Sequence, residues 1–319
     1  MSQRPAHREP SPALAYWMLA VGQLAIGSAA LLARFGLDAG AHPVVLAAWR
    51  LTLAAIMVLA GCALAAMSRT RARSAQVPAL RLAAAGVLLG LHFAAWFASL
   101  QRTPVALSTL LVCTTPVWTG LGGRLFLGER VRPWFWAGLA IAAAGMRLIT
   151  LGSASAPLPI PNQQTAGAAL AVAGAMLIAA YLLIIQKLTV LPQGEALGTW
   201  QLVAWTYSFG ALSLWPFALA AAPPSRVFAT PVAVWLSALG MAVVPQIIGH
   251  TVINWSVRRL PAPQVAATIL TEPVFAAALA WAFLGERVRL HQGIGGVILL
   301  AGVALAMRGA PPAIPEEPL

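Results

Sequence analysis

Only one acidic residue, Glu272, lies deep inside an apolar stretch of this sequence. It stands about ten residues into the stretch 262–284, and the other seven Asp and Glu residues fall in tails, in loops or at the ends of apolar stretches. An acidic group at mid-helix costs about 2.5–3.5 kcal/mol to insert into a membrane, so it usually has a function. We expect Glu272 to bind a coupling ion or a substrate amine. The alternative is a structural carboxyl group that stays protonated or pairs with Arg50.

The stretch 231–257 carries Gln246, His250 and Asn254, which follow one another at intervals of four residues. In a helix this spacing places the three side chains on one face. Lipid cannot satisfy their polar groups, so the face is predicted to line a water-filled cavity, or else to form hydrogen bonds between helices. His250 can share protons with Glu272 near neutral pH. A comparable stripe of polar residues four apart lies on the stretch 262–284: Gln264, Thr268 and Glu272.

Two prolines stand directly beside these candidate groups. Pro273 follows Glu272, and Pro116 follows Thr115. A proline cannot donate a hydrogen bond to the carbonyl group four residues earlier, so each proline frees a backbone acceptor inside the membrane. The sequence therefore predicts a helix break or hinge at Pro116 and at Pro273.

The first half of the chain offers aromatic side chains instead of a carboxyl group. His92 and Trp96 lie one helical turn apart in the stretch 80–101. An aromatic-lined cavity would suit an amphipathic solute, although aromatic residues inside a bundle also serve simple packing. The next stretch, 104–125, adds three further candidate lining residues: Ser108, Thr115 and Trp118.

Arg50 lies inside the apolar stretch 44–67, about a quarter of the way along it, whereas the other Lys and Arg residues lie in tails, in loops or near the ends of stretches. Its guanidinium group could bind a substrate carboxylate through two hydrogen bonds. It could equally extend toward the membrane surface or bind the backbone carbonyl groups of a neighbouring helix. Both a binding role and a structural role therefore remain open for Arg50.

The composition is that of a membrane protein. Hydrophobic residues make up 60% of the 319 residues and charged residues 9%, against roughly 45–50% and about 25% in soluble domains. The net charge of +12 does not indicate a nucleic-acid partner, because the basic residues stand singly or in small groups beside apolar stretches and form no basic face. Such positions are typical of the ends of membrane spans.

The apolar stretches predict an all-α membrane protein with ten transmembrane helices. A span needs about 20 mostly apolar residues. A polar tail, residues 1–13, precedes the spans, a Pro-rich linker, 152–165, divides them, and a second tail, 309–319, follows them. The ten expected spans are 14–36, 44–67, 80–101, 104–125, 133–151, 166–188, 197–221, 231–257, 262–284 and 291–308.

The basic residues also predict an orientation. With ten spans, both termini lie on one side, which collects thirteen of the Lys and Arg residues against six on the other, with Arg50 inside a span. Basic residues concentrate on the cytoplasmic side of membrane proteins. Both termini are therefore expected in the cytoplasm, and the protein in the cell inner membrane.

The chain contains a duplicated segment. Residues 104–132 and 261–289 align without a gap, and both end in the sequence LGERVR. Each half, 14–151 and 166–308, holds five expected spans, so the two halves must enter the membrane from opposite sides. An inverted repeat of this kind is typical of secondary transporters, in which a central site opens alternately to each side.

These features resemble the EamA-type members of the drug/metabolite transporter superfamily. The resemblance rests on the two five-span halves, the LGER sequence after the fourth and ninth spans, and an Arg early in the second span, Arg50 in AAWRLTLAA. Relatives of this type export amino acids, drugs and other metabolites. The resemblance implies that relatives with such different substrates share this Arg, which favours a structural role for Arg50. The resemblance implies the fold and does not identify the substrate.

Several other chemistries are not expected. The sequence has no phosphate-binding loop, no HExxH and no CxxC motif, so nucleotide hydrolysis, a metal, a cofactor and enzymatic activity are not predicted. We expect a secondary transporter for small organic metabolites, with a lipid bilayer, a small-molecule substrate and protons as candidate partners, acting as a monomer or homodimer. The alternative is a membrane scaffold or sensor that uses the same fold without transport.

Overall fold

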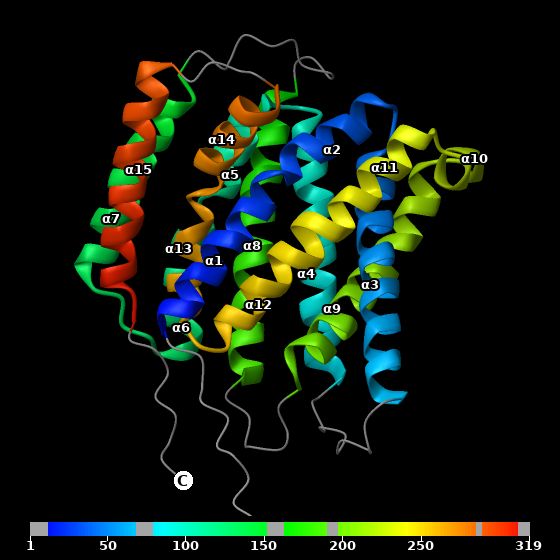
Figure 1. Ribbon diagram of the computed structural model, residues 1–319, viewed down its shortest axis with the longest axis horizontal. Helices are drawn as coiled ribbons and strands as arrows, with labels where there is room; N and C mark the ends of the chain where they lie inside the picture. Colours follow the sequence, from blue (N-terminus) through cyan, green and yellow to red (C-terminus); the bar gives the residue numbers. More distant parts are fainter. Residues whose placement is uncertain (1–11, 68–78, 152–162, 190–196, 285–288, 312–319) are drawn as a thin grey trace, which may run out of the picture.

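A computed structural model describes residues 12–67, 79–151, 163–189, 197–284 and 289–311. Within these segments every regular element is a helix (Figure 1). Helices satisfy their own backbone hydrogen bonds, as the interior of a bilayer requires. The helices of the first half are α1 (Pro12–Gly27), α2 (Ala29–Asp38), α3 (Pro43–Met67), α4 (Ala79–Leu100), α5 (Val105–Val112), α6 (Thr115–Leu127) and α7 (Pro133–Ile149).

The second half repeats this order with a few additions. A π-helix, Ala242–His250, joins two α-helices within one span, and a short helix precedes that span. The helices of the second half are α8 (Gln164–Thr189), α9 (Thr199–Ala221), α10 (Pro224–Phe228), α11 (Val232–Met241), α12 (Thr251–Val257), α13 (Ala262–Ile269), α14 (Glu272–Leu284) and α15 (Leu290–Gly309).

Nine stretches of the described chain are helical, long and apolar enough to cross a membrane, judged by length and composition. The fifth expected span is α7, which has 17 residues and is shorter than the others. The protein is thus a multi-pass membrane protein, and its described part is all-helical. Ten crossings and the side on which the termini lie remain predictions.

The two pairs α5–α6 and α13–α14 form broken spans. Each pair is interrupted two residues before a proline, at Cys113–Thr114 and at Leu270–Thr271. In Figure 1, α5 and α14 lie toward one end of the bundle, and α6 and α13 toward the other. The two broken spans therefore run in opposite directions, and α6 packs against α13 where they pass.

Helices α7 and α15 pack side by side in antiparallel directions, and glycines allow their close contact. The backbone N–H of Arg132 donates to the Gly309 carbonyl group, 2.9 Å away, which places the start of α7 beside the end of α15. A Cβ atom on Gly302 would lie 2.7 Å from the Gly138 carbonyl oxygen, and one on Gly138 would lie 2.6 Å from the Gly302 oxygen. Only glycine allows the two backbones to approach this closely.

The first copy of the LGER sequence ends α6. Gly128 has a left-handed backbone, with φ of 69°, and the N–H of Glu129 donates to the Gly123 carbonyl group. Glycine at this position is a common helix stop because it has no Cβ to clash. The second copy, with Gly285 and Glu286, lies outside the described residues.

Candidate functional site

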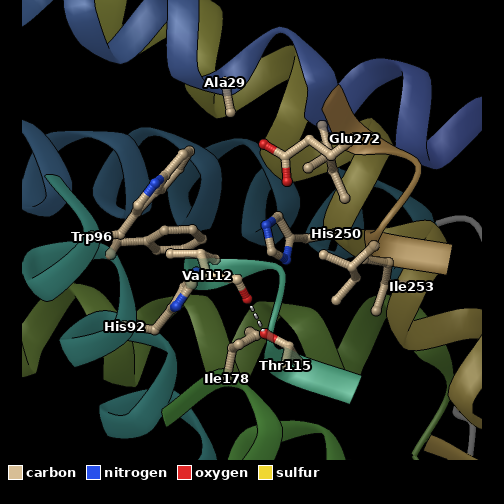
Figure 2. Close-up of a pocket in the computed structure, with 12 residues that line it drawn as sticks. Ala29, His92, Trp96, Val112, Thr115, Ile178, His250, Ile253 and Glu272 are labelled. Carbon is tan, nitrogen blue, oxygen red and sulfur yellow. Dashed lines mark hydrogen bonds between the residues drawn. The ribbon is translucent and has the colours of Figure 1, made fainter. Parts of the chain in front are cut away.

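A small cavity lies in the middle of the bundle, between the broken spans and their neighbours (Figure 2). Its volume of about 30 Å³ leaves room for about two water molecules. Five of the predicted site residues line it: His92, Trp96, Thr115, His250 and Glu272. The rest of the wall is aromatic or aliphatic: Ile26, Ala29, Phe93, Val112, Ile178, Ile253 and Ile269.

Glu272 is the first residue of α14, so the break in the ninth span places its side chain at a helix N-terminus. The carboxyl group points into the cavity, near the His250 ring (Figure 2). Only 5% of the residue is exposed, and no contact within 4.0 Å pairs it with Arg50 in the described part of the chain. The structural alternative of a direct Arg50–Glu272 ion pair is therefore wrong for this conformation.

His250 comes from the end of the π-helix and meets the cavity beside Phe93. The two rings pack edge to face, with centroids 5.2 Å apart. The Nδ1 atom of His250 is buried and has no hydrogen-bond partner among the described residues. A ring nitrogen without a protein partner is available to water, to a substrate or to a proton.

His92 and Trp96 form the aromatic side of the cavity on α4. Their rings are stacked, with centroids 6.3 Å apart. His92 Nδ1 lies 2.9 Å from the Gly174 carbonyl oxygen of α8. A carbonyl oxygen only accepts, so Nδ1 carries the hydrogen and His92 Nε2 is left as the acceptor. This contact fixes the orientation of the ring.

Arg50 and Gln246 lie behind the cavity wall and not on it. The Arg50 Nε atom donates to Gln246 Oε1 over 2.9 Å, and the guanidinium carbon lies 3.8 Å from the centroid of the Phe93 ring. Both residues have no exposed surface. Arg50 is therefore linked to the cavity wall through Phe93, which lines the cavity.

Asn254 does not reach the cavity, although it lies one turn after His250. Its Oδ1 atom accepts a hydrogen bond of 2.6 Å from the Tyr181 hydroxyl group, and its Nδ2 atom donates to the His250 carbonyl group. Tyr207 acts similarly, since its hydroxyl group donates to the Gln246 carbonyl oxygen over 3.1 Å. These contacts hold the span that contains the π-helix against α8 and α9.

The other predicted residues of the ninth span also lie outside the cavity. Thr268 accepts a hydrogen bond of 3.0 Å from Gln23 of α1. Gln264 donates to the Tyr16 hydroxyl group at the exposed edge of the bundle. Of the polar stripe on this span, only Glu272 lines the cavity.

In the fourth span, Thr115 lines the cavity and Ser108 and Trp118 do not. The Ser108 hydroxyl group lies 2.5 Å from that of Ser99, where both are buried. Trp118 donates to the Thr114 hydroxyl group. These two residues therefore make contacts that hold the helix and its neighbours.

Pro116 and Pro273 both leave a carbonyl group without its helical partner, and side chains bind the freed oxygens. The Thr115 hydroxyl group donates to the Val112 oxygen over 2.7 Å, as Figure 2 shows. The Ile269 oxygen accepts a weaker contact of 3.7 Å from the Cys113 thiol group of the other half. The breaks are thus stabilised at the cavity itself.

Sequence reasoning did not identify Gln23, Tyr181 and Tyr207. Each is a buried polar residue, and each bonds to a residue of the polar stripes or to its backbone. The signal that could have found Gln23 is the one used for Glu272, a lone polar residue in an apolar stretch. The described residues contain no group of three His, Cys, Asp or Glu side chains that could hold a metal ion.

Comparison with known proteins agrees with this architecture. The chain is 28% identical over 301 residues to a probable terminal-alkyne amino-acid exporter of Streptantibioticus cattleyicolor, covering 92% of this chain and 93% of that one. It is 25% identical over 218 residues to an uncharacterized transporter of Archaeoglobus fulgidus, covering 68% and 73%. A riboflavin transporter of Rhizobium johnstonii is 37% identical over 128 residues, 40% of each chain.

A protein of known crystal structure has the same fold, with a TM-score of 0.70, 21% identity and coverage of 94% of this chain and 98% of that one. The sequence model of the EamA-like transporter family matches twice, at residues 13–151 and 165–308. The family and the named relatives are transporters and not enzymes. With nearly its whole length matched, this chain belongs to the EamA-like transporter family.

Proposed function

We propose that the protein is a secondary transporter that exports or exchanges small organic metabolites, such as amino acids or similar amphipathic solutes. The observation that carries this proposal is the cavity where the two broken spans meet, with Glu272 and His250 facing a wall that is otherwise mostly apolar or aromatic. The named relatives support it, since one is called an amino-acid exporter and another a riboflavin transporter.

Transport would proceed by alternating access between two inverted halves, 14–151 and 166–308, joined by the linker 152–165. We propose ten spans, five in each half, in the cell inner membrane with both termini in the cytoplasm. The opposite directions of α5–α6 and α13–α14 support the inversion, and the double match to the family supports the duplication. A cavity of about 30 Å³ is too small for a metabolite, so the halves must move apart to admit one.

Proton coupling is the form of transport that the polar groups favour. Glu272 and His250 are neighbours on the cavity wall, and the buried Nδ1 atom of His250 has no hydrogen-bond partner among the described residues. Two titratable groups that face the same small space can exchange protons with it when the space opens to either side. Pro116 and Pro273 would act as hinges beside them.

The test is flux in reconstituted vesicles across a panel of amino acids, amines and drugs, with and without a pH gradient. We expect at least one compound to move and its flux to depend on the gradient. Flux that ignores the gradient would indicate an uncoupled carrier. A membrane scaffold or sensor is the second candidate, and it would be favoured if no compound in the panel moved.

A further inference from the structure

Three buried hydrogen-bond donors behind the cavity wall have no partner in the described part of the chain. They are Nη1 and Nη2 of Arg50 and Nε2 of Gln246. The two side chains hold each other through the bond from Arg50 Nε to Gln246 Oε1. Their remaining donors are therefore held together in a fixed cluster, contributed by α3 and by the π-helix.

Such a cluster is costly unless something binds it. A buried charge without hydrogen bonds loses its hydration and gains little in return. The face of the Phe93 ring, 3.8 Å from the guanidinium carbon, attracts the positive charge. However, the N–H bonds point outward in the guanidinium plane, and an aromatic face cannot satisfy them. A carboxylate can, because its two oxygens match the planar fork of the guanidinium group.

The opposite charge lies on the other half of the molecule. Glu272 faces the cavity from α14, and no contact within 4.0 Å joins it to Arg50. Phe93 and His250 pack together and both line the cavity. A ligand with one negative and one positive group would pair with Arg50 and Glu272 without changing the net charge of the bundle. A plain anion or a plain cation would leave one of them unpaired.

We infer that Arg50 and Gln246 form a carboxylate subsite, and that the substrate carries a carboxylate together with an amine that faces Glu272. This inference rests on the proposed transport function and adds the charge pattern of the substrate. The carboxylate would reach the edge of the guanidinium group as part of the opening of the halves that any substrate requires.

Gln246→Glu separates this role from a structural one. The new carboxylate would lie where Gln246 Oε1 now accepts from Arg50 Nε, so it would pair with the guanidinium group and keep it buried. If Arg50 only holds helices together, this variant should fold and transport as well as the wild type. If the cluster binds the substrate carboxylate, the carboxylate introduced at position 246 would occupy its place and the substrate carboxylate would no longer be needed.

The experiment compares amino acids with their carboxamides in proteoliposomes, and repeats the comparison with Gln246→Glu. Gln201→Glu is the matched control, because Gln201 is exposed at the start of α9 and its side-chain oxygen only caps the Gly198 N–H. We expect the wild type to transport the acid about 30-fold better than its amide. Gln246→Glu should lose this preference, and Gln201→Glu should keep it. Substrate-induced thermal stabilisation in detergent should follow the same pattern.

Three results would overturn the subsite while leaving transport intact. One is equal flux of acids and amides in the wild type, and another is an undiminished preference for acids in Gln246→Glu. Flux of amines or drugs without flux of any acid would have the same meaning. If no compound moves at all, the transport proposal fails, and the subsite fails with it.

Discussion

Glu272 combines two properties at the level of a single residue: it is almost completely buried, and its carboxyl group faces the cavity. A group that takes up and releases a proton during transport needs both. We predict that Glu272→Gln loses the stimulation of flux by a pH gradient, about tenfold or more. Proteoliposome assays with and without the gradient measure this.

Asp38→Asn is the control for that prediction, since Asp38 forms an exposed pair with Arg34 at the end of α2. An exposed ion pair contributes little to stability, and its loss should not alter the response of flux to the pH gradient. If the flux of Glu272→Gln still follows the gradient, another group carries the proton.

Glu129 outside the spans gives a prediction about stability. Burial raises the pKa of this carboxyl group above its ordinary value, and the hydrogen bond from Gln186 opposes the shift in part. Gln186 also accepts from the N–H of Ala262, 2.6 Å away, so the contact joins the loop after α6 to α8 and to the start of α13. The folded protein holds the proton more tightly than the unfolded chain, so this contribution to stability is lost as the pH rises through the ordinary value toward the raised one.

We therefore predict that Glu129→Gln raises the melting temperature at pH 7 by about 1–3 °C and leaves it nearly unchanged at pH 4. The amide keeps an oxygen that accepts from Gln186 and removes the charge. Melting curves of the detergent-solubilised protein between pH 4 and pH 8 test the difference. A gain that is larger at pH 4 than at pH 7 would contradict the sign of the shift.

Which polar residues face the cavity could be predicted only in part. The isolation of Glu272 in an apolar stretch identifies a residue that must have a special environment, and the structure places it on the cavity wall. The spacing of four residues predicts a shared face for His250 and Asn254. In the structure only His250 of these two lines the cavity, because Asn254 is bonded to Tyr181 of α8. The sequence of one helix does not specify where its neighbour crosses it.

Among the elements, α7 and α15 depend on glycine for their contact. A Cβ atom on Gly302 would lie 2.7 Å from the Gly138 oxygen and meet the Ala142 backbone. We predict that Gly302→Ala destabilises the protein by about 1–3 kcal/mol or more, because backbone atoms cannot move aside as a flexible side chain can. Melting temperature and the yield of monodisperse protein in detergent report this loss.

Gly293→Ala provides the matched control on the same helix, since nothing lies within 4 Å of a Cβ atom there. It should be neutral or slightly stabilising. Equal melting temperatures for the two variants would show that the α7–α15 contact relaxes without cost.

The sequence predicts the breaks in the fourth and ninth spans better than it predicts the eighth span. Proline removes a donor at a known position, so a break beside Pro116 and Pro273 follows from local chemistry. The π-helix at Ala242–His250 contains Pro245, but a proline alone also permits a simple kink. The Tyr207 hydroxyl group, which donates to the Gln246 carbonyl oxygen, comes from a distant part of the chain. Tertiary contacts of this kind lie beyond a single stretch of sequence.

At the scale of the whole molecule, the cavity and the α7–α15 contact both join residues that correspond in the internal repeat. Phe93 and His250 meet at the cavity, and they correspond to each other at the same interval of 157 residues that relates Pro104 to Pro261. Gly138 and Gly145 correspond to Gly295 and Gly302 in the same way. The repeat predicts that corresponding elements meet around a central axis. It does not predict that one half supplies the carboxyl group of Glu272 and the other half the hydroxyl group of Thr115.

The inversion of the halves predicts the membrane sides of two corresponding residues. Arg132 and Arg289 are both exposed and directly precede α7 and α15. The Arg132 N–H bonds to Gly309 at the far end of α15, and His291 at its start contacts the Leu151 carbonyl oxygen just after α7. Arg132→Cys and Arg289→Cys, each in a background without Cys62 and Cys113, should therefore react with a membrane-impermeant maleimide from opposite sides, with Arg132→Cys labelled from the cytoplasm. Labelling of both from one side would contradict the inverted repeat, and alternating access between the halves would lose its structural basis.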